Sequence, residues 1–271
     1  MNLIHALISD ENTEKVYEKE AGRLYDEVNL CAVKRTAGVK FMEYYNEVEK
    51  RILELYKKIE LGDSEICRNC RLNCDLSLPV GCWCVGNHFF EHEKRVLFVG
   101  KNARGNPGKV CGTFRNSYEV TRDYLWERSW PYWSYTGAIT ETLFGEDSPE
   151  HIAFTNIVKC NDSPDVDTTS DFVKEHCIKQ LKVLRYEIEI IKPTHIIFYT
   201  SWDYDNYIGD VFDEFAIKSN TQKQVGRKNM PWLEANASIN QSDLKILRIG
   251  HPERKKKEDF VNCVVDWVNK N

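Results

Sequence analysis

The sequence predicts an α/β fold with three layers, α/β/α, around a central and mainly parallel sheet of about four strands, preceded by an N-terminal helical extension. Three observations predict this fold. Short apolar runs recur along residues 96–249, a segment with helical spacing lies between two of them, and residues 1–60 have helical spacing without any such run.

The expected strands are apolar runs rich in β-branched and aromatic residues, each bounded by Gly, Pro or polar residues. They are residues 96–100, 152–158, 195–200 and 244–249.

Two expected helices follow from the three-and-four spacing of apolar residues. Residues 171–191 keep this spacing until Pro193 ends it, and residues 257–269 form a closing helix. Because a helix between two strands makes a right-handed crossover, neighbouring strands are expected to be parallel.

The N-terminal part of the chain differs in character. A stripe of buried-type residues between Phe41 and Ile59 indicates helices packed against a core, and no site chemistry is visible there. We therefore expect a helical extension at 1–62 and a second domain at 63–271.

Composition allows a full core, since 42% of the 271 residues are hydrophobic. The net charge of −5 does not by itself indicate a nucleic-acid partner, but basic residues gather at 94–118, where no acidic residue occurs, and at 254–257. No 18-residue apolar run and no basic, apolar signal sequence is present, so we expect a cytoplasmic protein without membrane contact.

Ten cysteines in such a protein indicate metal or redox chemistry rather than disulfides. Cys67 and Cys70 form a C-x-x-C pair, with Cys74, Cys82 and Cys84 close behind. This local set suits tetrahedral zinc, and it also suits a larger metal centre completed from elsewhere in the chain.

Unusual residues lie at or directly after the ends of three of the expected strands. They are residues 100–105, Asn156 with Lys159 and Cys160, and residues 250–252. In open α/β sheets the carboxyl ends of the strands form the ligand site, so these segments are expected to meet there.

The same three segments resemble the uracil-DNA glycosylase superfamily. FVGKNARG is similar to its first motif and GHPERK to its second, while TNIVKCN, a helix carrying Cys177 and then KPTHIIFYT are similar to its iron-sulfur branch, family 4. That branch also has a C-x-x-C ahead of the first motif. The resemblance covers residues 64–268.

The resemblance implies a 4Fe-4S cluster held by four thiolates. Its ligands would be Cys67, Cys70, Cys160 and Cys177. A zinc site built from the cysteines between Cys67 and Cys84 is the alternative.

The resemblance also implies base excision repair, by hydrolysis of the N-glycosidic bond of uracil or a related damaged base in DNA. Asn102 would position water and His251 would stabilise the departing base. Asn156 would read the base through its amide and Phe114 would stack on it, although the Phe114 loop lacks the family's proline.

The expected partner is DNA, single-stranded or damaged, bound by a monomer through cationic side chains. These are Lys101, Arg104, Arg254, Lys255 and Lys256. Lys101 stands where the iron-sulfur branch usually has a carboxylate, so a catalytically weak or inactive nucleic-acid-binding protein is the alternative function. A zinc-stabilised interaction protein is a third.

Overall fold

The computed structural model describes residues 45–74, 83–102, 121–123, 125–128, 131–160, 169–252 and 255–271. The chain divides into two compact units, Met1–Tyr45 and Asn46–Asn271, and the second contains every helix and strand that is described. Residues 1–44 of the expected helical extension therefore lie outside the described residues.

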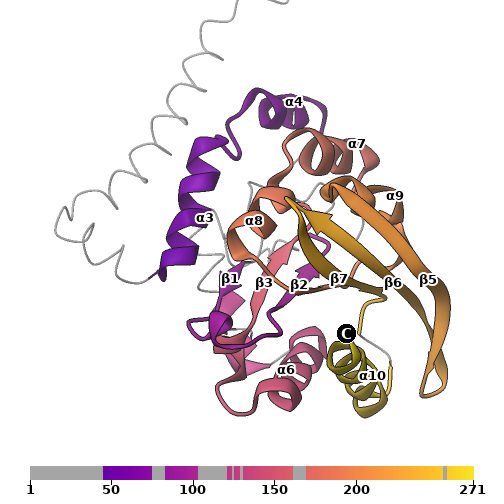
Figure 1. Ribbon diagram of the computed structural model, residues 1–271. Helices are drawn as coiled ribbons and strands as arrows, with labels where there is room; N and C mark the ends of the chain where they lie inside the picture. Colours follow the sequence, from indigo (N-terminus) through magenta and orange to yellow (C-terminus); the bar gives the residue numbers. More distant parts are fainter. Residues whose placement is uncertain are drawn as a thin grey trace, which may run out of the picture. The chain divides into compact units, whose positions relative to one another are not determined.

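Within the described part of the chain, seven strands form one sheet in the order β1-β3-β2-β4-β7-β6-β5 (Figure 1). The strands are β1 (Cys84–Val85), β2 (Val96–Gly100), β3 (Ala153–Asn156), β4 (His195–Phe198), β5 (Glu214–Val225), β6 (Lys228–Ile239) and β7 (Ser242–Ile249). The four runs expected as strands correspond to β2, β3, β4 and β7, which are neighbours and pair in parallel. The expected mixture of helices and strands is confirmed.

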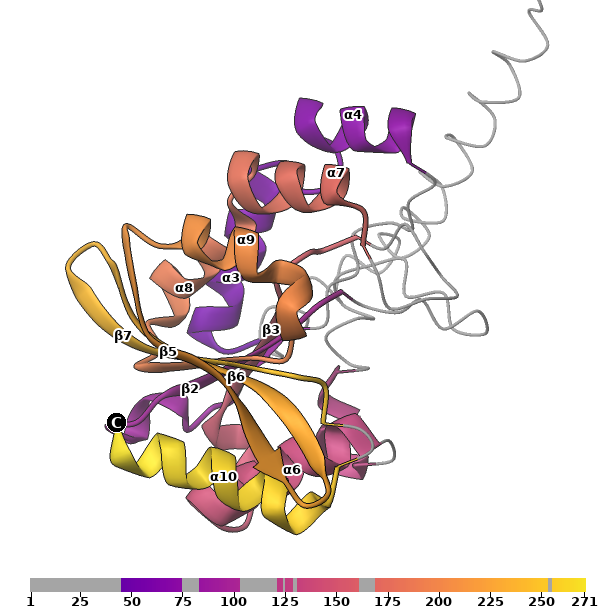
Figure 2. The same cartoon turned by 90° about the vertical axis from the view of Figure 1, so that its right-hand side faces the viewer.

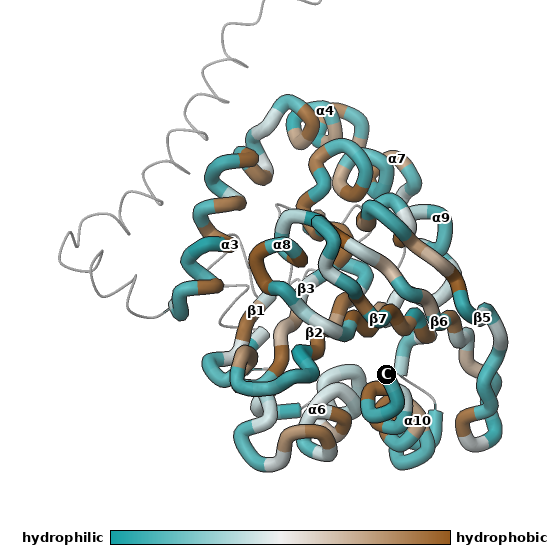
Figure 3. The backbone as a smooth tube through the Cα atoms, in the orientation of Figure 1, coloured by the Kyte–Doolittle hydropathy of each residue, from teal (hydrophilic) through white to brown (hydrophobic). Residues whose placement is uncertain are grey.

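The expected count of about four strands is wrong, and the described sheet is mixed rather than mainly parallel. Strands β1, β5 and β6 make antiparallel pairs. β1 has two residues, too few to give a pattern. β5 is exposed at most of its positions, so no buried face imposes alternation on its sequence. Figure 3 shows β5 as more hydrophilic than β7.

The helices lie on both sides of the sheet in Figure 2, with α6 and α10 on one side and α3 and α8 on the other. The α-helices are α3 (Glu47–Lys58), α4 (Glu65–Asn73), α6 (Pro131–Phe144), α7 (Asp171–Lys174), α8 (Val183–Ile191), α9 (Asp205–Ile208) and α10 (Lys257–Lys270). Strands β2 and β4 are buried at every position, as expected of strands covered on both faces.

The helix expected at 171–191 is interrupted. It consists of α7, the π-helical segment η3 (Glu175–Gln180) and α8. Lys182 lies between η3 and α8 with φ of 55°, a left-handed conformation that ends the first helical run. The apolar spacing continues through the break because both parts bury residues, among them Ile178 and Ile188.

Helix α3 is attached to the sheet at its first turn. Asn46 and Glu49 form a capping box there. The same two side chains bind β1, because Asn46 Nδ2 donates to the Val85 carbonyl at 2.8 Å and the Val85 amide donates to Glu49 Oε1 at 3.0 Å. Among the described residues, no helix has the length and apolar character needed to cross a membrane.

The strand order identifies where a ligand is expected. From β2 the chain moves to β3 on one side and later to β4 and β7 on the other. In such sheets ligands bind beyond the carboxyl ends of the strands where the direction reverses, which here is between β2 and β4.

Candidate functional site

Four of the predicted site residues, Lys101, Asn102, Asn156 and His251, lie at the carboxyl edge of the sheet. Gly100 at the end of β2 pairs with Asn156 at the end of β3, and Lys101 and Asn102 follow directly. His251 follows β7, which is parallel to the same strands. Three segments that are far apart in the sequence, at residues 100–102, at Asn156 and at His251, therefore end at one edge.

Two polar side chains approach Gly100 closely. A Cβ added there would lie 3.0 Å from Asn156 Oδ1 and 3.0 Å from the hydroxyl oxygen of Tyr132. Asn156 itself is only 3% exposed. The backbone at Gly100 is therefore bordered by an amide and a phenol that approach from β3 and α6.

Tyr132 connects this position with His251. The Tyr132 ring lies 5.0 Å from the His251 ring at an interplanar angle of 32°, and 5.2 Å from the Tyr199 ring at 77°. The carbonyl of His251 accepts a hydrogen bond from the Lys255 ammonium. Lys255 thus stabilises the turn that carries His251.

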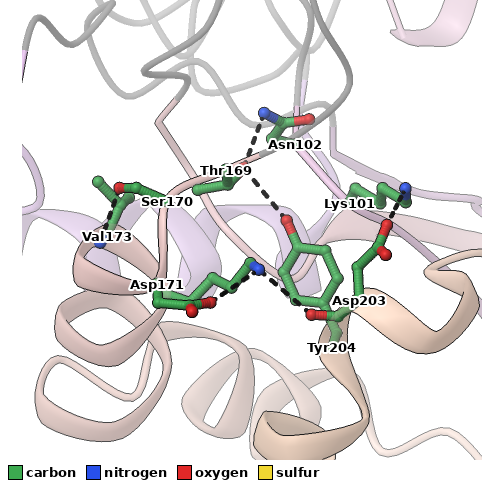
Figure 4. A network of polar contacts seen from close by, with 9 residues as sticks. Lys101, Asn102, Thr169, Ser170, Asp171, Val173, Asp203 and Tyr204 are labelled. Atoms are coloured by element: carbon green, nitrogen blue, oxygen red, sulfur yellow. Dashed lines mark hydrogen bonds and ion pairs between the residues drawn. The ribbon is translucent and has the colours of Figure 1, made fainter.

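The side chain of Asn102 is held by a hydroxyl relay (Figure 4). Its Nδ2 donates to Thr169 Oγ1 at 2.9 Å, and the Tyr204 hydroxyl donates to the same oxygen at 3.1 Å. Because Nδ2 points at Thr169, Oδ1 lies on the other side of the amide. The relay fixes the orientation of Asn102 before any substrate is present.

Lys101 forms an ion pair with Asp203 (Figure 4). The distance from Lys101 Nζ to Asp203 Oδ2 is 2.6 Å, and the side chains are 12% and 48% exposed. Asp203 belongs to η4 (Ser201–Tyr204), the turn after β4. The side chain of Lys101 is therefore directed to a carboxylate at the neighbouring strand end.

The turn after β4 is strained at its first residue. Ser201 has φ of 56°, a left-handed conformation that costs a non-glycine residue of order 1 kcal/mol. The sharp turn brings Asp203 towards β2 and leaves Trp202 53% exposed. Strain of this kind is common at functional sites.

The four predicted cysteine ligands lie close enough to influence one another. Cys67 and Cys70 are on α4, and α4 is bonded to η3, which carries Cys177, by a 3.2 Å contact from Asn69 Nδ2 to His176 Nε2. The pKa of the Cys160 thiol is raised well above its usual value by burial, and further by the nearby thiols of Cys177, Cys67 and Cys70.

Cys177 shows the same convergence. Burial raises the pKa of its thiol to about 12, opposed by a hydrogen bond from the Lys159 backbone and by the Lys159 charge, while Cys67 raises it further. Among the described residues, no group of three or more His, Cys, Asp or Glu side chains is arranged to hold a metal ion. Of the local zinc alternative, Cys82 lies outside the described residues.

A buried network lies between the cysteines and Asn156. Lys159 Nζ contacts Glu187 Oε1 at 2.7 Å, Thr155 Oγ1 at 2.6 Å and the Asn156 carbonyl at 2.7 Å. The Tyr56 hydroxyl also donates to Glu187 Oε1, the oxygen that Lys159 contacts. The Lys159 and Glu187 side chains are 2% and 1% exposed, so this ion pair is part of the core.

Some predicted site residues lie outside the described residues, namely Arg104, Phe114 and Arg254. Lys256 is described, and its ammonium pairs with Asp259 at 3.0 Å. Sequence reasoning missed Tyr132, Thr169 and Asp203. Asp203 and Trp202 follow an expected strand, so their position alone was a usable signal, whereas nothing local marks Tyr132 or Thr169.

No protein-family model matches the chain, and no curated protein matches its sequence significantly.

Proposed function

We propose that this protein is a DNA glycosylase-like enzyme that hydrolyses the N-glycosidic bond of uracil or a related damaged base, with a three-layer α/β/α fold of the uracil-DNA glycosylase type. The observation that carries the proposal is the meeting of Asn102, Asn156 and His251 at one edge of the sheet. These are the residues that the motif resemblance assigns to water, base and leaving group.

The proposed base pocket is formed around Gly100. The Asn156 amide can donate to one position of a pyrimidine edge and accept from the next. Its 3% exposure means that a base must leave the helical stack to reach it. Tyr132 lies beside both Asn156 and His251 and is an aromatic surface of the kind that a flipped base contacts.

The reaction exchanges one bond for another. The bond from the sugar C1′ to the base nitrogen breaks, its electron pair stays on the base, and C1′ bonds to the oxygen of water, whose lost proton ends on the base. His251 would donate a hydrogen bond to the departing base, and Asn102 would orient the water. The Thr169 relay that holds Asn102 supports this role.

Asp203 supports an enzymatic function even though Lys101 stands where a carboxylate is usual. The carboxylate that the iron-sulfur branch carries after the first-motif glycine is absent, yet Asp203 brings a carboxylate to the same residue from the end of β4. We assign Asp203 as a positioning residue that holds Lys101 in place beside Asn102.

The proposed cofactor is a 4Fe-4S cluster on Cys67, Cys70, Cys160 and Cys177. A single zinc ion with Zn–S bonds of about 2.3 Å would bring its sulfurs to roughly 3.8 Å from one another, whereas a four-iron cluster binds each thiolate to a different iron. The four cysteines come from three separate segments, and the pKa of the Cys160 thiol is raised by burial and further by the thiols of the other three, which supports a cluster shared by all four. When bound, it would join α4, η3 and the segment after β3.

The proposed setting is a cytoplasmic monomer acting on damaged or single-stranded DNA. The competing candidate is a non-enzymatic nucleic-acid-binding protein with the same fold and cofactor. The observation that favours it is Lys101, which stands in the sequence where the iron-sulfur branch usually has a carboxylate and whose side chain is only 12% exposed.

The deciding experiment is base release by anaerobically purified protein. Single- and double-stranded oligonucleotides containing one uracil, hypoxanthine or xanthine are incubated with the protein, and abasic sites are revealed by alkaline cleavage. Release from at least one substrate is expected. DNA binding without release from any of them would replace the enzyme by the binding protein.

A further inference from the structure

The hairpin formed by β5 and β6 extends beyond the rest of the sheet on the side of the candidate site. The β6–β7 ladder ends at Trp232 and Ile249, whereas β5–β6 pairing continues to Val225 and Lys228. The four residues of β6 before Trp232 therefore project roughly 14 Å past the end of β7. His251 follows the strand end that the hairpin passes.

The projecting part is held against the segments that flank His251. A Cβ added at Gly250 would lie 3.2 Å from Pro231 Cδ, so the hairpin stem touches the residue before His251. A Cβ added at Gly226, in the turn, would lie 3.0 Å from Lys256 Cβ. Gly226 has φ of 59°, which suits glycine in a tight turn.

The part of the hairpin nearest its turn is basic. Between Glu214 and Glu234 the sequence contains no acidic residue. Its cationic residues are Lys218, Lys223, Arg227 and Lys228. The turn places the last two next to the start of α10, where the sequence has Lys255, Lys256 and Lys257 followed by Glu258 and Asp259.

Of the hairpin's cationic residues, the two at the turn are the ones that a ligand can reach. Arg227 and Lys228 are exposed, and no described carboxylate forms an ion pair with either. Lys223 lies 4.2 Å over the Trp232 ring, while Lys256 pairs with Asp259. Lysines on an edge strand such as β5 discourage strand pairing between molecules. That explanation covers Lys218 and Lys223 but not two cations in the turn.

We propose that the turn of this hairpin, residues 224–230, is a contact surface for the phosphate backbone of the nucleic acid that enters the candidate site. The surface is cationic, lies beside His251, and offers polar side chains such as Gln224 and Asn229 that suit phosphate and sugar oxygens. The inference rests on the proposed function for the identity of its partner.

The test measures binding of uracil-containing single-stranded DNA by fluorescence anisotropy at several salt concentrations. The variant changes Arg227→Gln and Lys228→Gln together. The matched control changes Lys57→Gln and Lys58→Gln, two exposed lysines at the end of α3, and alters net charge equally. Thermal unfolding of both variants checks that they are folded.

The hairpin variant should bind about tenfold more weakly near 0.1 M salt, and its log–log salt slope should fall by about 1.4, the value for two lost contacts to a single strand. The control should match the wild type. If the hairpin variant binds DNA as tightly as the control, the inference is overturned. It is also overturned if the variant loses affinity for polyglutamate as much as for DNA, because the surface would then bind any acidic polymer.

The proposed function fails separately. Wild-type protein that binds DNA through the hairpin but releases no base overturns the enzyme and leaves the surface. Base release that does not depend on the hairpin overturns the surface alone, and absence of any DNA binding overturns both. If the double variant is unfolded, the single variants Arg227→Gln and Lys228→Gln with the same salt series give the decision, each with an expected slope change of about 0.7.

Discussion

Two lysine–carboxylate pairs follow neighbouring strands, and their surroundings differ. Lys159 and Glu187, after β3, are 2% and 1% exposed and share a network with Tyr56 and Thr155. Lys101 and Asp203, after β2 and β4, are 12% and 48% exposed. Each pair joins a lysine to a carboxylate, but only the second pair is partly exposed to solvent.

The difference in exposure indicates that the first pair contributes to stability and the second to the chemistry of the site. A buried ion pair is costly to desolvate and strongly destabilising to break, because the remaining charge has no solvent. A half-exposed pair contributes little to stability but can position groups that meet a substrate. We therefore expect variants of the first network to unfold the protein and variants of the second to change its reaction.

The largest effect is expected at the cysteines beside the buried network. Cys160→Ser or Cys177→Ser should remove nearly all iron from protein that otherwise holds about four irons per chain. Iron content and visible absorbance of anaerobic protein measure this, with Cys263→Ser on α10 as the control. Iron retained in both variants, or stoichiometric zinc without iron, contradicts the ligand assignment.

The next effect is on stability. Glu187→Ala should lower the free energy of unfolding by about 3–5 kcal/mol, because it leaves the Lys159 ammonium buried without a counter-charge. Urea unfolding followed by circular dichroism measures it. A loss below about 1 kcal/mol, the range of surface pairs, would mean that water reaches this network.

At the candidate site, substitutions should raise the activation free energy of base release by a similar amount and leave the free energy of unfolding unchanged. Asn102→Ala and His251→Ala should each slow base release a hundredfold to a thousandfold, about 2.7–4 kcal/mol of transition-state stabilisation. Single-turnover assays give the rate, and anisotropy should find DNA affinity nearly unchanged. An equal loss of rate and affinity would make these residues binding groups instead.

His195 extends the comparison to a buried histidine at the start of β4. Burial, with smaller contributions from Lys94 and Lys245, lowers its pKa to about 4, whereas an unfolded histidine titrates near 6.5. The unfolded chain thus binds more protons between these values. Stability should be lost as pH falls through this window, by about 2–3 kcal/mol. His195→Asn should flatten the dependence measured by urea unfolding.

The smallest effect on stability is expected at the half-exposed pair. Asp203→Asn should change the free energy of unfolding by less than about 1 kcal/mol. It should nevertheless slow base release, because Lys101 loses the group that holds it beside Asn102. If stability falls as far as in Glu187→Ala, Asp203 belongs to the core and not to the site.

The spacing of apolar residues predicted the strands and helices whose burial follows a simple rule along their whole length. Strands β2 and β4 are covered on both faces, so their sequences are continuous apolar runs that identify them. Helix α10 buries one face and shows the expected spacing. Strand β5 could not be found this way, since its exposed residues are constrained by pairing with β6 and not by burial.

The sequence by itself determined which residues lie at strand ends, and with them the positions of Asn102, Asn156 and His251 along the chain. Only the tertiary structure decided which partners they meet. Thr169 reaches Asn102 and Asp203 reaches Lys101 across gaps of 67 and 102 residues. Such contacts depend on how the strands are ordered in the sheet, and strand order is a property of the packed chain that no local pattern of residues records.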